Sequence, residues 1–224
     1  MKILKNLLPV ILLFLFIQAA PAQEIVTAGR FLERVSERYA GVRDYEARIA
    51  IRSGNSSMSG QISYLSPRYM RIDFIEPANQ VICFNGELLT VYLPGYRAVL
   101  NQEVTTRGPT LASSEGLGLF RRNYEPSFVS GPEPVPLDEG SREQVVKLRL
   151  LRRSVSEGFR EVVLSINPDN LLIRRIEGRS IAETTVRFDF TSINTNLGIP
   201  AGRFIYDAPA SANMYNNFLF RDTD

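Results

Sequence analysis

The sequence predicts a mainly β protein with some α-helix: a single curled antiparallel sheet, or incomplete barrel, covered by an N-terminal helix and a short helical lid. Runs of alternating apolar and polar residues, the period of a strand with one buried face, recur along most of the chain. The breaks between these runs are short and rich in Gly, Asn, Pro and Ser, which is typical of antiparallel reversals. Helical spacing is confined to two segments.

The first helical segment, residues 25–40, has one apolar face and is expected to end at Gly41. The second lies within residues 109–126, where Ser-Ser-Glu precedes three apolar residues and two arginines, and we expect a short helix or flap there. Residues 129–141 are rich in Pro, Gly and acidic residues and indicate a loop. The apolar face of the first helix consists of Ala28, Phe31, Leu32, Val35 and Tyr39.

About ten strands account for the remaining periodicity. The turn of residues 54–57 and the Asn85-Gly86 dipeptide supply hairpin chemistry between successive strands. The expected strands cover residues 43–52, 57–64, 69–75, 80–84, 87–93, 96–102, 144–152, 159–167, 171–178 and 184–191, with a further short strand around Phe204.

Two closures fit such a sheet: a two-sheet sandwich, or a single sheet curled into a barrel or half-barrel whose mouth is covered by helices. The number of apolar residues does not choose between them. The segregation of helical material into two segments favours the curled sheet. Such a sheet encloses more volume than its own side chains fill, and an apolar lining would receive an acyl chain, although for any single residue a place in the core is the simpler interpretation.

The composition argues against most enzyme classes. The 224 residues contain no histidine and one cysteine, so the commonest general base at neutral pH and the usual ligands of zinc, copper and haem are missing. Basic and acidic residues number 26 and 24, and no Lys/Arg cluster is interleaved with aromatics, which argues against nucleic-acid binding. We expect a protein that is not an enzyme and that has no metal site or cofactor. Cys83, between two apolar residues, is expected to be a buried, inert thiol.

Two pairs of carboxylates are close in sequence but do not predict acid–base chemistry. Asp44 and Glu46 share the polar face of a strand, where carboxylates keep a surface soluble. Asp73 and Glu76 form the second pair, and no histidine, metal motif or nucleophile accompanies either.

Residues 1–22 are typical of a secretory signal. A charged start and the apolar stretch 7–17, which is too short to span a bilayer comfortably, precede the small-residue site Ala20-Pro21-Ala22. No cysteine follows this site, so the signal is not of the lipid-anchored kind. We expect cleavage near Ala22, export to the periplasm, and one domain over residues 23–224.

The order of these features resembles the bacterial outer-membrane lipoprotein carrier, or LolA, family. The resemblance rests on the signal peptide, a helix with Tyr39 near its end, and the stretches VRDYEARIAI, GQISYLSPRYMRIDF, VICFNGELLTVYLP, SSEGLGLF and RFIYDAP. It implies an incomplete antiparallel barrel whose concave apolar face, covered by helices, binds the acyl chains of lipoproteins.

The resemblance also implies site residues. The expected lid residues are Leu117, Leu119 and Phe120. Better-known members carry an arginine just before the proline of the third-strand motif, and it fastens the lid; here that position is Ser66, and Arg68 and Arg71 nearby need not replace it. The residues expected to line the cavity are Ile49, Ile51, Met58, Ile62, Met70, Ile72, Phe74, Phe84 and Val91.

The partners that the resemblance implies are acylated lipoproteins or lipids, an inner-membrane lipoprotein-releasing transporter and an outer-membrane acceptor, and we expect a monomer. The alternative is a periplasmic regulatory binding module that senses mislocalised lipoproteins or lipids and binds a membrane signalling protein. Such sensors usually add a second domain, for which residues 23–224 leave little room.

Overall fold

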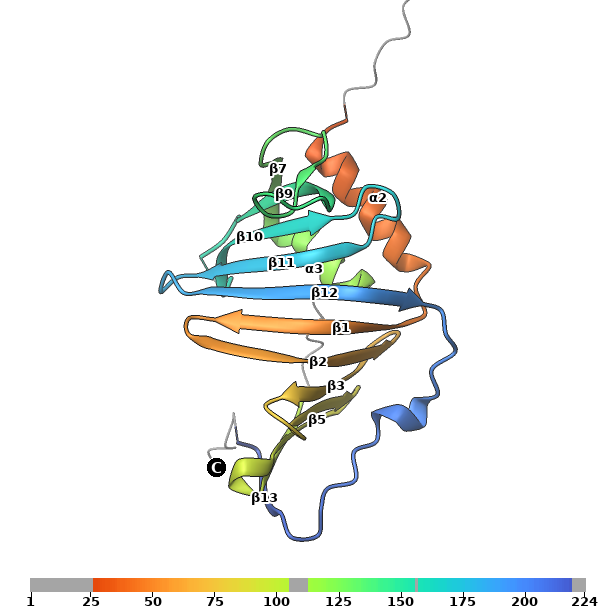
Figure 1. Cartoon of the computed structure of the whole chain (residues 1–224), viewed down its shortest axis with the longest axis vertical. Coiled ribbons are helices and arrows are strands. Elements are labelled where there is room, and N and C mark those ends of the chain that lie inside the picture. Colours follow the sequence, from red (N-terminus) through yellow and green to blue (C-terminus); the bar gives the residue numbers. More distant parts are fainter. Residues whose placement is uncertain (1–25, 105–112, 156, 219–224) are drawn as a thin grey trace, which may run out of the picture.

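The computed structural model describes residues 26–104, 113–155 and 157–218, arranged as in Figure 1. The expected signal, residues 1–22, lies outside the described residues. Those residues form one open, curled sheet of 13 strands together with two α-helices, which confirms the predicted fold class. No helix within them is long and apolar enough to cross a membrane.

The strands lie in the order β13-β6-β5-β4-β3-β2-β1-β12-β11-β10-β9-β7, and the short β8 pairs with β9. All neighbours are antiparallel except β13 and β6, which run parallel. Their bounds are β1 Asp44–Ser53, β2 Ser56–Leu65, β3 Tyr69–Glu76, β4 Val81–Asn85, β5 Leu88–Leu93, β6 Ala98–Glu103, β7 Tyr124–Phe128, β8 Val135–Pro136, β9 Gln144–Arg152, β10 Phe159–Ile166, β11 Ile173–Ser180, β12 Thr185–Thr195 and β13 Asn213–Asn216.

The sheet is not a simple meander, because its two halves meet between β1 and β12. Strands β1 to β6 follow one another on one side, and β12 back to β9 on the other. In the central pair Ile49 lies opposite Phe190 and Ile51 opposite Phe188, so apolar side chains continue across the junction. Helix α3 (Ser114–Asn123) leads the chain into β7, at the far edge of the sheet from β6.

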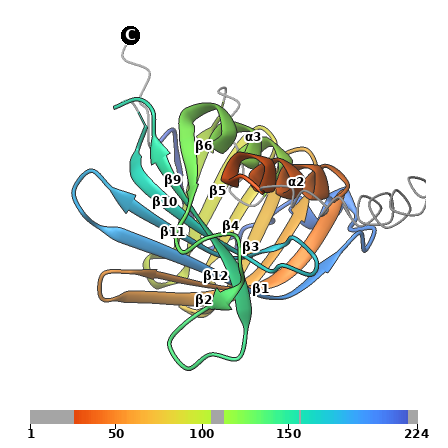
Figure 2. The ribbon, with the colours of Figure 1, turned by 90° about the horizontal axis from the view of Figure 1, so that it is seen from above.

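Both helices lie over the same, concave face of the sheet (Figure 2). Helix α2 (Ala28–Ala40) begins where Thr27 Oγ1 accepts a hydrogen bond from Arg30 N at 3.2 Å, and it ends at Gly41. Its five buried residues are the five predicted from the 3.6-residue period. Helix α3 is capped in the same way by Ser113 Oγ, which accepts from Gly116 N at 3.1 Å.

The chain after β12 lies along the outer face of β3 and β4, where it forms a second, smaller apolar cluster. A strand around Phe204 was predicted, and this prediction is wrong. Residues Ala201–Phe204 form the 3-10 helix η3, which turns the buried ring of Phe204 toward Val81 and Cys83. The predicted loop 129–141 contains the short β8, and β13 was not predicted.

Candidate functional site

The concave face under α2 and α3 is the candidate site. It forms one continuous apolar cluster with the two helices, to which β1, β2, β3 and β9 to β12 all contribute. Of the nine residues predicted to line a cavity, Ile49, Ile51, Ile62, Ile72 and Phe74 are buried in this cluster. Met58 and Met70 are half-buried and pack against it.

The strand register explains why these residues meet. Two rows of cross-strand neighbours run over the concave face, since residues that are directly opposite point to the same side. Phe84 and Val91 belong to these rows, nearer the β6 edge; Phe84 is buried and Val91 half-buried. One row contains Ala47, Ile62, Ile72, Ile82, Val91 and Leu100, and the other Tyr45, Tyr64, Met70, Phe84, Leu89 and Gln102.

Helix α3 supplies the residues predicted for the lid. Leu117 and Phe120, three positions apart, both face the concave cluster, and Phe120 packs edge-on against Tyr124 at 5.5 Å between ring centroids. Leu119 is half-buried and lies outside the cluster. Arg121 forms an ion pair of 3.0 Å with Glu33 of α2, so the two helices are joined by a polar contact as well as by packing.

Neither nearby arginine takes up the role of the missing lid arginine at Ser66. Arg71 lies on the outer face, where its guanidinium donates to Asp73 at 2.9 Å and to the carbonyl oxygen of Arg203 at 3.2 Å. Arg68 lies over the ring of Phe84, with 5.4 Å between the guanidinium carbon and the ring centroid.

Tyr64 is the side chain that connects this region to the lid. Its hydroxyl donates to the carbonyl oxygen of Pro67 at 3.1 Å and lies within reach of the hydroxyls of Ser66 and Ser113, the residue that caps α3. Burial is the largest influence on this hydroxyl and raises the pKa of Tyr64.

Tyr64 belongs to a group of three buried tyrosines that sequence reasoning did not single out as site residues. The rings of Tyr45 and Tyr64 stack at 5.1 Å, and Tyr39 of α2 accepts a hydrogen bond from Ile173 N at 3.1 Å. Burial raises the pKa of Tyr39 to about 12, so its hydroxyl stays protonated. The alternation of β1 did place Tyr45 on the apolar face, but the same pattern fits any core aromatic.

The carboxylates near β1 and β3 are structural, and the expectation that Asp44 lies on a wet face is wrong. Asp44 is buried, and its carboxylate accepts hydrogen bonds from Leu197 N at 2.6 Å and Gly198 N at 3.1 Å. Asp73 pairs with Arg71 and Arg203. Burial alone would raise the pKa of Asp73, but the two guanidinium groups outweigh it and the pKa is lowered.

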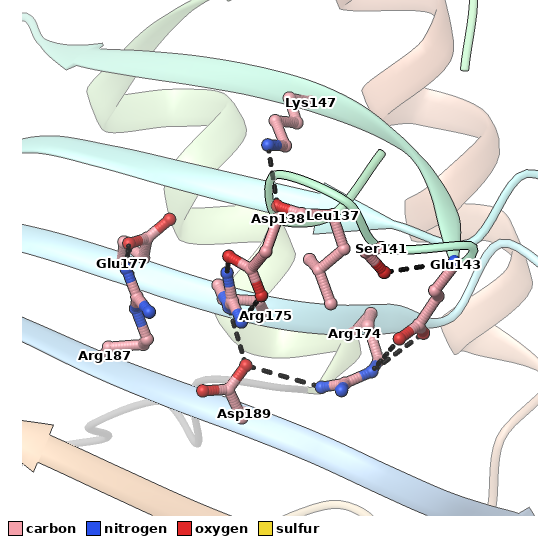
Figure 3. A network of polar contacts seen from close by, with 10 residues as sticks. All are labelled: Leu137, Asp138, Ser141, Glu143, Lys147, Arg174, Arg175, Glu177, Arg187 and Asp189. Carbon is pink, nitrogen blue, oxygen red and sulfur yellow. Dashed lines mark hydrogen bonds and ion pairs between the residues drawn. The ribbon is translucent and has the colours of Figure 1, made fainter. Parts of the chain in front are cut away.

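Charged side chains gather on the outer face of β11 and β12, where they pair with one another (Figure 3). Arg175 contacts Asp138 and Asp189, and Arg187 contacts Glu177. Over residues 26–104, 113–155 and 157–218, no group of three or more His, Cys, Asp or Glu is placed to hold a metal ion. The arrangement on this face therefore points to structure, and the chemistry of the concave face is that of apolar contact.

Known proteins share both the sequence pattern and the fold. An outer-membrane lipoprotein carrier protein from Bordetella avium is 24% identical over 159 residues, which cover 70% of this chain and 71% of that protein. A crystal structure of an uncharacterized conserved protein from Thermus thermophilus has 15% identity and a TM-score of 0.54, covering 84% of this chain and 98% of its own. MucB has 14% identity and a TM-score of 0.50, covering 81% of this chain and 63% of its own.

No family model matches the sequence. The match to the carrier protein runs over most of both chains, and the curled sheet with two helices on its concave face is the architecture that the resemblance implies. The chain belongs to the LolA-like family.

Proposed function

We propose that the protein is a periplasmic carrier that binds the acyl chains of lipoproteins, or of other lipids, between its concave sheet face and the helices α2 and α3, and shuttles them from the inner to the outer membrane. The observation that carries this proposal is the apolar cluster itself, in which strands from both halves of the sheet share one face with two covering helices. The proposed cavity residues are the nine predicted ones, and Leu117, Leu119 and Phe120 form the proposed lid.

The energetics of such a cluster suit transfer. Contacts between helix and sheet that are lost on opening are replaced by contacts with acyl chains, at about 25 cal/mol per Å² of apolar surface. The ligand therefore binds with the difference between two similar terms, and an acceptor that shelters the chains better can remove them. Helices α2 and α3 contact each other and the edge strand β7, so an outward movement of the pair need not break the sheet.

The remaining parts of the proposal follow from the family and the sequence. We infer that residues 1–22 direct export to the periplasm, that a lipoprotein-releasing transporter of the inner membrane supplies the cargo, and that an outer-membrane acceptor receives it. The protein would act as a monomer without catalysis, cofactor or nucleic acid. Its relative is named a carrier of outer-membrane lipoproteins, which supports this kind of cargo.

A displacement experiment tests the proposal. A hydrophobic fluorescent probe bound to the mature protein should be displaced by a diacylated peptide at micromolar concentration and not by the same peptide without acyl chains. Met70→Lys should weaken binding of the probe, because it places a charge on the half-buried concave face. Ile75→Lys, on the same strand but 70% exposed, is the matched control. If the diacylated peptide does not displace the probe, the proposal is wrong.

The second candidate is a regulatory module that binds a lipid or lipoprotein as a signal, and the observation in its favour is the fold shared with MucB. Native mass spectrometry of protein taken directly from the periplasm separates the two. A lipid or lipopeptide retained on most molecules supports a carrier, whereas a stable complex with the periplasmic part of a membrane protein supports the module.

A further inference from the structure

The buried hydroxyl of Tyr45 has no hydrogen-bond partner among the described residues. The side chain lies on the concave face of β1 and is 3% exposed. Its two tyrosine neighbours are different: Tyr64 donates to the carbonyl oxygen of Pro67, and Tyr39 accepts from Ile173 N. The group therefore contains two hydroxyls with partners and one without.

Stability does not explain this hydroxyl. A buried polar group without a partner costs about 1–3 kcal/mol, whereas a phenylalanine would fill the same space and keep the stacking on Tyr64 without this cost. Burial is also the largest influence on the group and raises the pKa of Tyr45 well above its ordinary value. The hydroxyl is thus a permanent hydrogen-bond donor in apolar surroundings.

Tyr45 also lines a small cavity between the end of α2 and the sheet. The volume is about 10 Å³, with mainly apolar walls that include Val42, Leu172 and Phe190. The cavity shares Leu172, Phe190 and Ile193 with a surface cleft of about 240 Å³. The cleft is polar, and its other walls include Asn167, Asn170 and Arg174.

Tyr45 therefore lies where the apolar cluster ends and a path toward polar surroundings begins. A lipid with ester- or amide-linked chains has the same order of groups: hydrocarbon, then a carbonyl oxygen that accepts hydrogen bonds, then a polar headgroup. A carbonyl that leaves water needs a donor, and the orphan hydroxyl can provide one.

We propose that Tyr45 donates a hydrogen bond to the carbonyl oxygen of an ester- or amide-linked acyl group, and so selects acyl chains over hydrocarbon chains that lack a carbonyl. The headgroup would leave through the cleft beside Asn170 and Arg174. This inference rests on the proposed binding of acyl chains on the concave face and names the chemistry that the site selects.

The test compares two ligands of equal chain length as competitors of the fluorescent probe: a diacyl lipopeptide with ester links, and its dialkyl ether analogue, which lacks the carbonyls. The wild-type protein should bind the ester on the order of tenfold more tightly, the size expected for one buried hydrogen bond. Tyr45→Phe should reduce this preference to near unity, leave affinity for the ether unchanged, and leave the melting temperature unchanged or raise it. Tyr64→Phe, which removes a hydroxyl that already has a partner, should keep the preference.

The outcomes are distinguishable. If Tyr45→Phe keeps the ester preference, or lowers the melting temperature as loss of a water-satisfied hydroxyl would, the inference is overturned while the proposed function stands. If the ether analogue displaces the probe from wild-type protein as well as the ester does, the hydroxyl selects nothing. If neither ligand displaces the probe, the proposed function fails and this inference fails with it.

Discussion

Arg175 Nε donates to Asp189 Oδ1 at 2.6 Å, and the two side chains are only 6% and 11% exposed on the outer face of β11 and β12 (Figure 3). The same guanidinium donates to both carboxylate oxygens of Asp138, in the loop before β9, at 2.7 and 2.9 Å. One buried cation thus joins two adjacent strands to a loop. Because both partners are taken out of water, removing one leaves the other without compensation.

The first prediction concerns this pair. Arg175→Met should lower the free energy of unfolding by about 3 kcal/mol, because Asp189 keeps only Arg174, at 3.4 Å, as a cationic partner. Arg187→Met is the matched control: its pair with Glu177 is about one-third exposed, and the loss should stay below about 1 kcal/mol. Urea unfolding followed by circular dichroism measures both. Equal losses in the two variants would contradict the role given to burial.

The second prediction is a pH dependence. Hydrogen bonds from Arg175 lower the pKa of Asp138 in the folded protein, while the unfolded carboxyl titrates at about 3.9. A depressed folded pKa adds stability above the unfolded pKa, and this stability is lost as the pH falls through the folded pKa. Asp138→Asn should therefore melt below wild type by a constant margin from pH 7 to 5, and the margin should shrink below pH 4. The effect should be modest, since Asp138 is 55% exposed, and a margin that widens in acid would reverse the assignment.

The local elements of this fold are largely encoded in short-range pattern. Residues 144–152 are predicted with the observed bounds of β9, and α2 differs only at its start, since 25–40 is expected and Ala28–Ala40 is observed. The pairing of β1 with β12 is different, because alternation fixes the side to which a residue points but not the strand that lies beside it.

The errors have physical causes as well. The tail around Phe204 has too few residues for a period to distinguish a strand from a turn of 3-10 helix. Asp44 is a charged residue at a strand end, and only the long-range approach of Leu197 and Gly198 makes its burial favourable. The unpartnered hydroxyl of Tyr45 depends on the same kind of information, since no pattern in β1 shows which hydroxyl will find an acceptor.

The third prediction concerns Gly60 in β2, opposite Ile49 and Phe74. A Cβ at this position would lie 2.3 Å from the carbonyl oxygen of Asp73, and backbone cannot move aside as a side chain can. Gly60→Ala should lower the free energy of unfolding by about 1–3 kcal/mol. Gly29→Ala in α2 meets nothing within 4 Å and should stabilise the protein by about 0.5–1 kcal/mol. A pair of thermal melts decides, and a stabilised Gly60→Ala would show that β2 and β3 are farther apart than described.

The fourth prediction uses Cys83 as a reporter of the tail. Its thiol is buried beneath Phe204 and donates to the carbonyl oxygen of that residue at 3.2 Å. Burial raises the pKa of the thiol, so little reactive thiolate is present at pH 8. Phe204→Ala removes the ring that fills this outer cluster, and the tail can detach without opening the central sheet. The rate of labelling by a thiol reagent should rise on the order of tenfold.

Because the chain has one cysteine, every labelling event reports this position. Ile205→Ala, next in sequence and 71% exposed, should label at the wild-type rate. Far-UV circular dichroism should show that both variants keep the sheet, which separates release of the tail from global unfolding. If Phe204→Ala labels no faster than Ile205→Ala while both stay folded, then Phe204 does not hold the tail over Cys83, and the contacts of Arg71 with Arg203 and Asp73 hold it instead.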